Sequence, residues 1–572
     1  MPKYPEKKIA QLLLQSCVAQ GIKKVVISPG SRNAPLTLGI VNHPDIHAFS
    51  IVDERCAAFF ALGMAQQSKK PVVLLCTSGS ALLNYYPAIA EAFYSNIPLV
   101  VISADRPKHL IDIGDGQTIR QEGVFINHIL SEVNLPSEAE YASKDDLEKD
   151  LVGFAKDLRI LLETAKFHMG PVHINIAFDE PLYETVPGLY DFGSLIEVGE
   201  RRLEDSLMDE KPLDVASLEV FADKWNASKR KMVIIGSNYP DELLSVQMRH
   251  LIKDPSVIVL TETSSNISDE GFINCIDQLI FPLEEEEFEA LKPDILLSFG
   301  GMVVSKRIKQ LLRKKQPMEH WHVDRYTSMD TYHCLTKHFS VSPQLFFSQF
   351  FFLTKNTDSN YQKKWLDLKE DRKRAHQKYL AQIQYSDMKV FDLILESLPV
   401  PSQIQFANSS IIRYSQLFDL KKDLSVFCNR GTSGIDGSTS TAIGAALENK
   451  EQTVLISGDI SFFYDSNALW NKYIPKNFRI ILVNNSGGGI FRIIPGPKSS
   501  DALEFFDTPH NLQAADLCKM HGFNYLSAKN LNELSAGLAN FYAPSERPVL
   551  LELFTPPEIN DEVLKNYFKS LA

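Results

Sequence analysis

Short runs of apolar residues recur along the chain, and segments with helical periodicity separate them. In the first third the apolar runs fall at residues 24–28, 48–52, 72–76, 99–103 and 172–177. Helices are expected to begin near Asn33, Glu54, Ser80 and Asp146. Apolar strands that alternate with helices are typical of a parallel sheet covered on both faces. The first third is therefore predicted to form a doubly wound α/β domain.

The same alternation returns twice more. The second set of apolar runs falls at 232–236, 257–261, 295–299 and 321–323, and the third at 405–407, 425–428, 453–457, 479–483 and 549–553. An irregular, charge-rich segment, 187–210, reads as a linker, and 363–378 as a charged helix forming a surface connection. A chain of this length is too long to fold around a single hydrophobic core and is expected to form several domains. We expect an α/β protein of three doubly wound parallel-sheet domains, at 1–186, 187–375 and 376–572.

Composition narrows the class of function. The 572 residues are 44% hydrophobic and 23% charged, with a net charge of −12, which argues against a general nucleic-acid or membrane-surface binder. Any anion site must then be a local basic cluster. The seven cysteines are scattered without a CxxC pair, as expected for a reducing cytoplasm. The segment after Lys7 reads as an amphipathic helix rather than a signal peptide, and no apolar run approaches the roughly 18 residues of a membrane helix.

Two strand ends in the last third carry the most informative polar residues. The run 453–457 leads into Gly458 and Asp459, and the run 479–483 leads into Asn485. A crossover helix near 466–473 would place the two strands side by side, with both ends at one edge of the sheet. An Asp and an Asn there can share a hard cation such as Mg²⁺. The glycines at 487–489 would let backbone amides approach a diphosphate.

Each of these pieces alone is an ordinary turn, but their ordered combination resembles the diphosphate-binding signature of thiamine-diphosphate enzymes. The resemblance implies thiamine diphosphate with Mg²⁺, or Mn²⁺, held by Asp459, Asn485 and Gly487. It also implies the three-domain order of that decarboxylase-like superfamily: a pyrimidine-binding, a central and a diphosphate-binding domain. The implied cofactor contacts are Glu54, Ser78, Gly79, Ser409, Ile435, Gly458, Asp459, Ile460, Ser461, Asn485, Gly487, Ile490 and Phe491. The chain departs from the family at Ile460, where Gly is usual.

The start of the helix after the second run has two interpretations. From the residues alone, Asp53 caps that helix and Glu54 favours its positive end. The resemblance gives Glu54 a sharper role, because the cofactor becomes reactive only when a carboxyl group shares a proton with its aminopyrimidine ring. Ile435 would likewise support the bent cofactor, or else be a plain core residue. The turn at 76–80 suits close approach of a ring or an anion, or is an ordinary connection.

Further segments in order, 28–35, 104–107, 116–121, 408–413 and 429–437, resemble the thiamine-diphosphate synthases of menaquinone biosynthesis. The resemblance implies decarboxylation of 2-oxoglutarate and a Stetter-type 1,4-addition of the resulting succinyl-semialdehyde carbanion to isochorismate. Both substrates are dianions, and arginine forks bind carboxylates in a bidentate manner. The implied substrate-binding residues are Ser31, Arg32, Arg106, Gln117, Lys306, Arg307, Ser409, Arg413 and Arg430. The implied catalytic residues are Glu54, Arg32, Arg106, Gln117, Arg413 and Arg430.

Two alternatives remain open from the residues. Another thiamine-diphosphate enzyme, a 2-oxo-acid decarboxylase or an acetohydroxyacid synthase, is disfavoured because the 14 histidines include no adjacent pair and none lies in these segments. A non-catalytic nucleotide-binding regulatory protein would use the central domain, where Gly236 and Gly300-Gly301 are only weak turn signals. The resemblance also implies a homodimer or a dimer of dimers, with active sites between subunits and no nucleic-acid or membrane partner.

Overall fold

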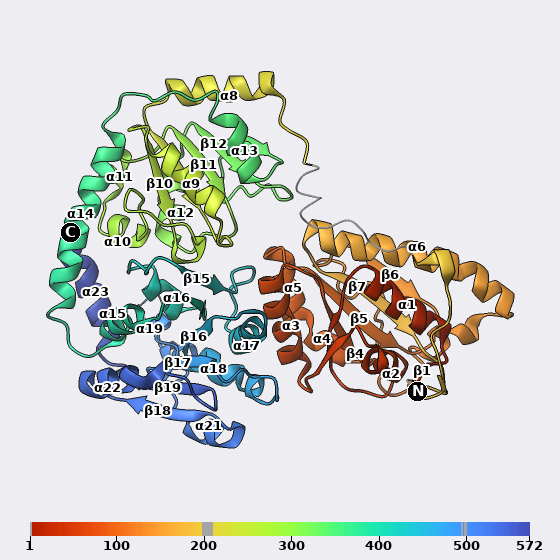
Figure 1. Ribbon diagram of the computed structural model, residues 1–572. Coiled ribbons are helices and arrows are strands. Elements are labelled where there is room, and N and C mark those ends of the chain that lie inside the picture. The colour runs from red at the N-terminus through yellow and green to blue at the C-terminus, as the bar shows by residue number, and fades with distance from the viewer. Residues whose placement is uncertain (1–2, 197–209, 494–495, 497–499) are drawn as a thin grey trace. The chain divides into compact units, whose positions relative to one another are not determined.

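The computed structural model describes residues 3–196, 210–493, 496 and 500–572 (Figure 1). The chain divides into two compact units. Unit 1 comprises Met1–Asp209, Gly431–Lys450 and Phe463–Phe478, and unit 2 comprises Glu210–Arg430, Glu451–Phe462 and Arg479–Ala572.

Unit 1 is built on a six-stranded sheet in which every neighbouring pair of strands is parallel. The strand order is β3 (His47–Ser50), β2 (Lys24–Ile27), β4 (Val72–Cys76), β5 (Leu99–Asp105), β7 (Val172–Ala177) and β6 (Glu132–Leu135). A small antiparallel pair, β1 (Tyr4–Pro5) with β8 (Thr185–Val186), forms a separate two-stranded sheet, and its residues Tyr4 and Val186 pack into the hydrophobic core of the six-stranded sheet. The central strands β4 and β5 are buried along their whole length, as their near-continuous apolar sequences require.

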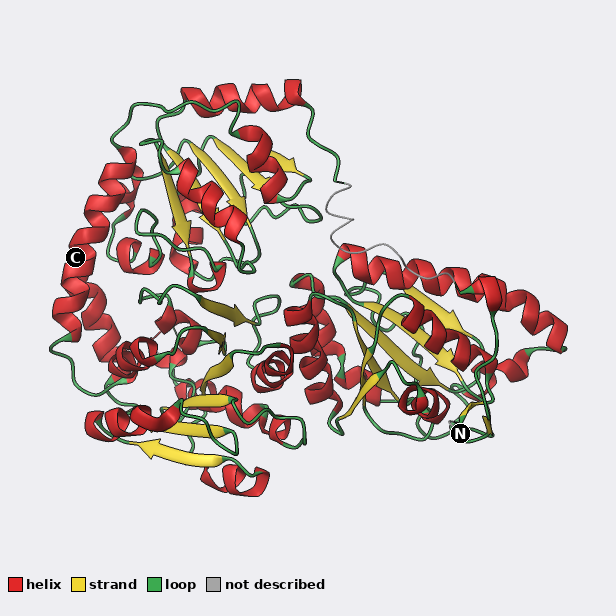
Figure 2. Ribbon diagram, viewed as in Figure 1, coloured by secondary structure: helices red, strands yellow, loops and turns green. Residues whose placement is uncertain are grey.

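Helices cover this sheet (Figure 2). The helices of unit 1 include these and one helix that packs on another helix. They are α1 (Lys8–Ala19), α2 (Ala34–Asn42), α3 (Glu54–Ser68), α4 (Ala81–Asn84), α5 (Tyr86–Tyr94), α6 (Lys144–His168) and α17 (Ser438–Glu448), with 3₁₀ turns at Lys108–Leu110, Glu138–Glu140, Gly193–Leu195 and Ser466–Leu469. Helices α3 and α17 pack in backbone contact. A Cβ atom at Gly63 would lie 2.0 Å from the Thr441 carbonyl oxygen, and one at Gly444 would lie 2.0 Å from that of Phe60. Only glycine permits this approach.

Unit 2 contains two further parallel sheets, shown as separate groups of yellow arrows in Figure 2. The central sheet has the order β10 (Val257–Thr261), β9 (Lys231–Ile235), β11 (Ile295–Phe299), β12 (Glu319–Val323) and β13 (Lys337–Phe339). The C-terminal sheet has the order β15 (Leu424–Cys428), β14 (Ser402–Phe406), β16 (Gln452–Gly458), β17 (Arg479–Asn484), β19 (Val549–Phe554) and β18 (Asn524–Ala528). Alternate residues of β9 enter two separate hydrophobic clusters, Val233 in one and Met232 in the other, so both faces of the central sheet are covered.

The helices of unit 2 are mostly short. They are α8 (Val215–Ala227), α9 (Glu242–Leu251), α10 (Ile276–Ile280), α11 (Glu285–Glu289), α12 (Lys306–Lys314), α13 (Pro343–Phe350), α14 (Tyr361–Leu380), α15 (Asp387–Ser397), α16 (Ser410–Ser415), α19 (Ile490–Ile493), α20 (Leu503–Asp507), α21 (Ala515–His521), α22 (Leu531–Phe541) and α23 (Asn560–Leu571), with a 3₁₀ turn at Thr263–Ser265. Helix α18 (Asp459–Tyr464) begins in unit 2 and ends in unit 1.

The predicted fold class, three parallel-sheet α/β domains, is confirmed. The strand predicted at 48–52 is wrong at its end: β3 stops at Ser50, and Val52 is 49% exposed. The helix predicted at 466–473 is reduced to the 3₁₀ turn Ser466–Leu469, because the crossover begins earlier, at Asp459. The predicted surface helix is α14, but Trp365 on it is fully buried.

Two smaller sequence expectations concern the linker and the cysteines. Residues 197–209 of the predicted linker lie outside the described residues, and the exact domain boundaries stay predictions. The seven cysteines all lie in the described part of the chain, and none forms a disulfide. None of the described helices combines the length and the apolar character needed to span a bilayer.

Candidate active site

Glu54 opens helix α3 in unit 1. Asp53 caps the helix, since its carboxylate accepts the Cys56 N–H at 3.0 Å, and it also accepts the Asn467 side-chain amide at 2.8 Å. Glu54 itself is half-buried, and burial raises the pKa of its carboxyl, with a smaller contribution from the negative charge of Asp53. Asp53 therefore fixes the helix end, and Glu54 is left as a carboxyl group that holds a proton more readily than usual.

The turn after β4 brings Gly79 close to Gln117. Ser78 is 3% exposed, and the Gly79 N–H donates to the Gln121 side chain at 2.9 Å. Gly79 has φ +89°, and a Cβ there would lie 3.2 Å from the Gln117 backbone. Gln117 has φ +55°, and its side chain is exposed. This glycine is required by both its conformation and its neighbour.

Arg32 and Arg106 form a pair of cations at the carboxyl ends of β2 and β5. Arg32 is 4% exposed; its guanidinium donates to the Phe178 carbonyl at 2.8 Å and contacts Glu180 at 3.1 Å. Burial, and then the nearby charge of Arg106, lower the pKa of Arg32. Arg106 contacts Asp115 at 3.4 Å. Both acidic partners are surface carboxylates, so a dianionic ligand can replace them.

The loop that carries Ile435 is anchored within unit 1 by a buried glutamate. Glu91 is 1% exposed, and its carboxylate accepts the N–H groups of Gly431 and Thr432, each at 2.7 Å. Ile435 is 37% exposed, so it is not a plain core residue. Ser31, on the loop after β2, is also exposed.

The diphosphate half of the predicted site lies in unit 2, at the adjacent ends of β16 and β17. Asp459 is 3% exposed; one carboxylate oxygen accepts the Ile460 N–H at 2.7 Å and the other accepts the Gly487 N–H at 3.0 Å. The backbone of Ile460 makes this contact, so the departure from Gly leaves it intact. Asn485 donates its amide to Asp387 at 3.0 Å.

Asn485 supplies the observation that tests a metal at this place. Its side-chain oxygen is buried and has no hydrogen-bond partner among the described residues, although such groups are rarely left unsatisfied. An amide oxygen beside the Asp459 carboxylate is a donor set for a hard cation, and both residues fit Mg²⁺. No described group of three or more His, Cys, Asp or Glu side chains forms a metal cage of its own.

Other predicted cofactor contacts lie near the carboxyl ends of β16 and β17. Gly458 closes β16, Ser461 is 5% exposed, and Ile490 and Phe491 begin α19 as half-buried residues. A Cβ at Gly489 would lie 2.9 Å from the Asn485 amide nitrogen. The glycine run therefore lets the backbone approach the Asn485 side chain.

A second pair of arginines lies at the carboxyl ends of β14 and β15. Arg413 donates to the Ser409 carbonyl at 2.8 Å, and Arg430 donates to the Asn408 side chain at 2.8 Å. Burial, and then the charge of Arg430, lower the pKa of Arg413. Ser409 has φ +68° and ψ −129°, a strained backbone for a non-glycine residue that often marks a functional site.

Helix α12 brings the two basic residues of the central domain to the same region of unit 2. Ser305 caps this helix; Lys306 is exposed, and Arg307 is half-buried with its guanidinium on the Leu283 carbonyl. Burial raises the pKa of Asp277, while the charges of Arg413 and Arg307 act in the opposite direction. Asp277 thus lies within electrostatic reach of both arginines.

Comparisons with known proteins identify the family of the domains that carry these residues. The chain matches three family descriptions: "Thiamine pyrophosphate enzyme, N-terminal TPP binding domain" at residues 7–126, "Middle domain of thiamine pyrophosphate" at 215–406, and "Thiamine pyrophosphate enzyme, C-terminal TPP binding domain" at 409–553. The solved structure of benzoylformate decarboxylase from Polynucleobacter necessarius shares the fold, with a TM-score of 0.71 at 13% identity over 96% of this chain and 99% of that one.

Curated relatives show which family of thiamine-diphosphate enzymes the chain resembles over its full length. Proteins named 2-succinyl-5-enolpyruvyl-6-hydroxy-3-cyclohexene-1-carboxylate synthase are 50% identical in Flavobacterium johnsoniae over 100% of both chains, and 52% identical in Christiangramia forsetii over 99% of both. The relative from Porphyromonas gingivalis is 37% identical over 100% of this chain and 98% of its own. The chain belongs to this synthase family. It is accordingly a thiamine-diphosphate-dependent enzyme, as the sequence predicted.

Membership of the synthase family favours an enzyme over the alternative of a non-catalytic, nucleotide-binding regulatory protein. The glycines of the central domain have a structural explanation. A Cβ at Gly236 would lie 1.9 Å from the Gly301 carbonyl oxygen, and the Gly301 N–H donates to the Ser237 carbonyl at 2.7 Å. Gly300 has φ +79°. These glycines let two loops of the central sheet pass in contact, and nothing in their arrangement calls for a nucleotide.

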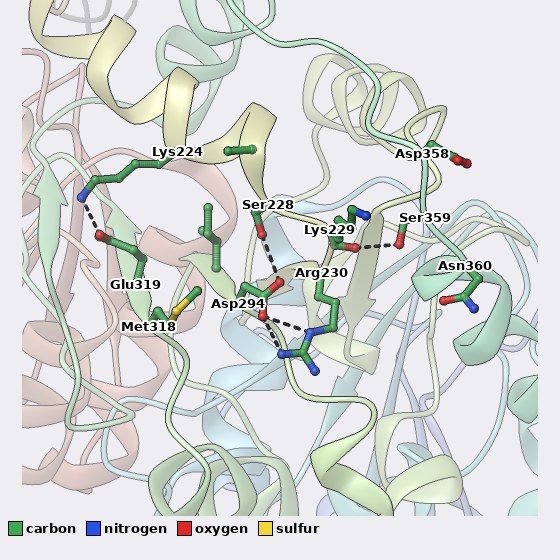
Figure 3. A pocket seen from close by; sticks show the side chains of 12 residues that line it. Lys224, Ser228, Lys229, Arg230, Asp294, Met318, Glu319, Asp358, Ser359 and Asn360 are labelled. Atoms are coloured by element: carbon green, nitrogen blue, oxygen red, sulfur yellow. Dashed lines mark hydrogen bonds and ion pairs between the residues drawn. The ribbon is translucent and has the colours of Figure 1, made fainter.

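A groove of about 1030 Å³ lies at the amino ends of β9, β11 and β12 (Figure 3). Two ion pairs lie in it: Arg230 binds Asp294 at 2.6 Å, and Lys224 binds Glu319. Ligands of open α/β sheets bind at the carboxyl ends of strands. Within unit 2 the groove thus lies at the opposite strand ends of the central sheet from Ser305 and Lys306 at the start of α12.

Sequence reasoning missed two buried carboxylates that support the site. Asp387 is 3% exposed and holds Asn485, and Glu91 holds the loop before Ile435. Asp387 follows the capping residue Ser386, so in the sequence it looks like an ordinary first-turn acid. No sequence signal distinguishes Glu91 from a surface residue of α5.

Proposed function

We propose that this protein decarboxylates 2-oxoglutarate and adds the remaining four-carbon unit to isochorismate, giving 2-succinyl-5-enolpyruvyl-6-hydroxy-3-cyclohexene-1-carboxylate and CO₂ in menaquinone biosynthesis. The observation that carries the proposal is the presence of two arginine pairs, Arg32 with Arg106 and Arg413 with Arg430. Like-charged guanidinium groups held together by the fold favour an anion with several carboxylates. The relatives' shared name supports the same reaction.

Bound thiamine diphosphate would supply the carbon centre that accepts the electron pair of the broken C–C bond. Asp459 and Asn485 would hold Mg²⁺, or Mn²⁺, with the Gly487 backbone, and the diphosphate would lie on that ion. Glu54 would hold a proton on its carboxyl group and share it with the cofactor's pyrimidine ring. Its raised pKa suits this role, because a carboxyl that remains partly protonated can both give and take the proton.

The arginines would orient the substrates and neutralise their charge. Burial of Arg32 strengthens each charge-assisted hydrogen bond that it makes, since water competes less there. Gln117 and Ser31 would add neutral hydrogen bonds beside Arg32. Lys306 and Arg307, at the start of α12, would contribute to the carboxylate site of Arg413, with Ser409 beside it. Ile435 would contact the cofactor through its exposed side chain.

The proposed reaction is tested by measuring CO₂ release from 2-oxoglutarate with thiamine diphosphate and Mg²⁺, with and without isochorismate. We expect steady CO₂ release to require isochorismate and to match formation of the cyclohexene product. Equal steady release of CO₂ and an aldehyde without isochorismate would identify a simple decarboxylase instead. Binding of a nucleotide together with no binding of thiamine diphosphate would contradict any thiamine-dependent function.

We propose further that the active enzyme is at least a homodimer, in which Glu54 of one subunit serves the cofactor held by Asp459 of the other. Equal amounts of inactive Glu54→Gln and Asp459→Ala protein are then expected to regain about a quarter of wild-type activity after random subunit exchange, because each mixed dimer has one intact site. Activity is measured after mixing, and exchange is verified with a mass-tagged subunit. Complete exchange without recovery would place each site within one subunit.

A further inference from the structure

A buried glutamate outside the predicted site holds the loop that leads into α12. Glu262 follows β10 directly and is 4% exposed. Its two carboxylate oxygens accept the N–H groups of Val304 and Ser305 at 2.6 and 2.7 Å. These are the last two residues before α12, so one side chain fixes the backbone at the point where the helix begins.

A second carboxylate, that of Asp277, also holds the start of α12. The Ser305 hydroxyl donates to Asp277 on α10 and also accepts the Ile308 N–H at 3.2 Å as the cap of α12. The first residues of the helix, Lys306 and Arg307, therefore follow a backbone that two acidic side chains hold in place. Lys306 and Arg307 are the residues that the sequence assigns to a substrate carboxylate.

The charged surroundings of Glu262 come from several elements. Asp277 on α10 raises the pKa of Glu262 and Arg430 after β15 lowers it, while Lys309 on α12 and Tyr332 also interact with its charge. Burial is the largest influence and raises the pKa to about 7, against the opposing effect of the two backbone hydrogen bonds. Glu262 thus changes its protonation near neutral pH.

We propose that Glu262 is a positioning residue that sets the start of α12, and with it Lys306 and Arg307, for binding a substrate carboxylate. The inference rests on the proposed function, because it needs an anionic substrate at α12. Glu262 does not itself touch the substrate; it acts through the two N–H groups that it accepts.

The physical reason lies in the number of acceptors. An ionised carboxylate accepts two N–H bonds, whereas a protonated one donates through its O–H group and keeps a single good acceptor. Protonation therefore deprives one buried N–H of its partner, and the loop must move to satisfy it. Glutamine has the same shape with one oxygen and one donor group, so Glu262→Gln imitates the protonated state at every pH.

The test is the Michaelis constant of each substrate between pH 6 and 8. One lost buried hydrogen bond corresponds to about tenfold in KM between the fully ionised and the fully protonated forms. In the wild type we therefore expect KM for one of the two substrates to rise about fivefold as the pH falls from 8 to 6, on either side of the pKa of about 7. In Glu262→Gln we expect the high KM throughout, with no pH dependence over this range and with kcat changed by less than about threefold. The carboxylates of 2-oxoglutarate do not titrate in this range.

Asp254 provides a matched control at the other end of the same strand. It precedes β10, is 5% exposed, and pairs with Lys231 at 2.8 Å. Asp254→Asn should lower the melting temperature of the central domain without changing the pH dependence of KM. Equal pH dependence in the wild type and Glu262→Gln, or a loss confined to kcat, would overturn the proposal.

Hydrogen exchange at the Val304 and Ser305 amides tests the role of Glu262 without any enzymatic activity. We expect faster exchange at these amides in Glu262→Gln, and in the wild type a greater loss of protection at pH 6 than the intrinsic rates account for. Unchanged protection would contradict the role of Glu262 even in an inactive enzyme. A wild type that turns over neither substrate, yet shows this change in protection, would refute the proposed function alone.

Discussion

Glu54→Gln is expected to bind thiamine diphosphate almost as tightly as the wild type and to lose roughly a hundredfold to ten-thousandfold in kcat. The amide has nearly the shape of the carboxyl group, so packing at the start of α3 should be preserved. It cannot take up and release a proton, which is what the raised pKa of Glu54 prepares this group to do. Steady-state product formation and a cofactor titration followed by circular dichroism give the two quantities separately.

Asp53→Asn is the matched control for this substitution. Asparagine caps helices about as well as aspartate, and Asp53 acts in the structure through hydrogen bonds to Cys56 and Asn467. We expect a small change in kcat for this variant. Near-normal turnover by Glu54→Gln, or an equal loss in both variants, would remove Glu54 from the proton-sharing role.

The central strand β14 (Ser402–Phe406), which alternates polar and apolar residues, was misplaced at 405–407, whereas central strands with a continuous apolar run were predictable because they are buried on both faces. Strands β4 and β17 have that character, and each was predicted within about one residue. Edge strands with mixed polarity were missed for the converse reason, whereas the apolar edge strands β10 and β15 were predicted within about one residue. Strand β6, Glu-Val-Asn-Leu, has one strand neighbour and mixed polarity, so its sequence resembles a loop. Strands β13 and β18 are edge strands that were missed in the same way.

The site was predictable to the extent that it follows strand ends. Asp459 and Asn485 are recognisable because parallel strands deliver their carboxyl ends to one edge. Asp387 and Glu262 lie far along the chain from the groups they hold, Asn485 and Val304. Such pairings depend on how the layers fold over each other, and one sequence contains no periodic signal for them. Sequence therefore indicates the groups proposed to bind the ligand better than the groups that hold them in position.

Asp459→Ala is expected to weaken metal-dependent binding of thiamine diphosphate by at least about a hundredfold, because even the outer partners of metal ligands cost 10- to 100-fold in metal affinity when removed. The substitution removes an anionic oxygen donor and also the acceptor of the Gly487 N–H at 3.0 Å. Asn485 keeps its oxygen, so high concentrations of Mg²⁺ and cofactor should restore part of the activity.

Cofactor affinity is measured by calorimetry at several Mg²⁺ concentrations, and the variant Asp516→Ala, at an exposed residue, is the control. The loss of one negative charge should also lower the pKa of Asp387, which Asp459 helps to raise. Unchanged affinity that does not depend on Mg²⁺ would show that the ends of β16 and β17 hold no metal–diphosphate site.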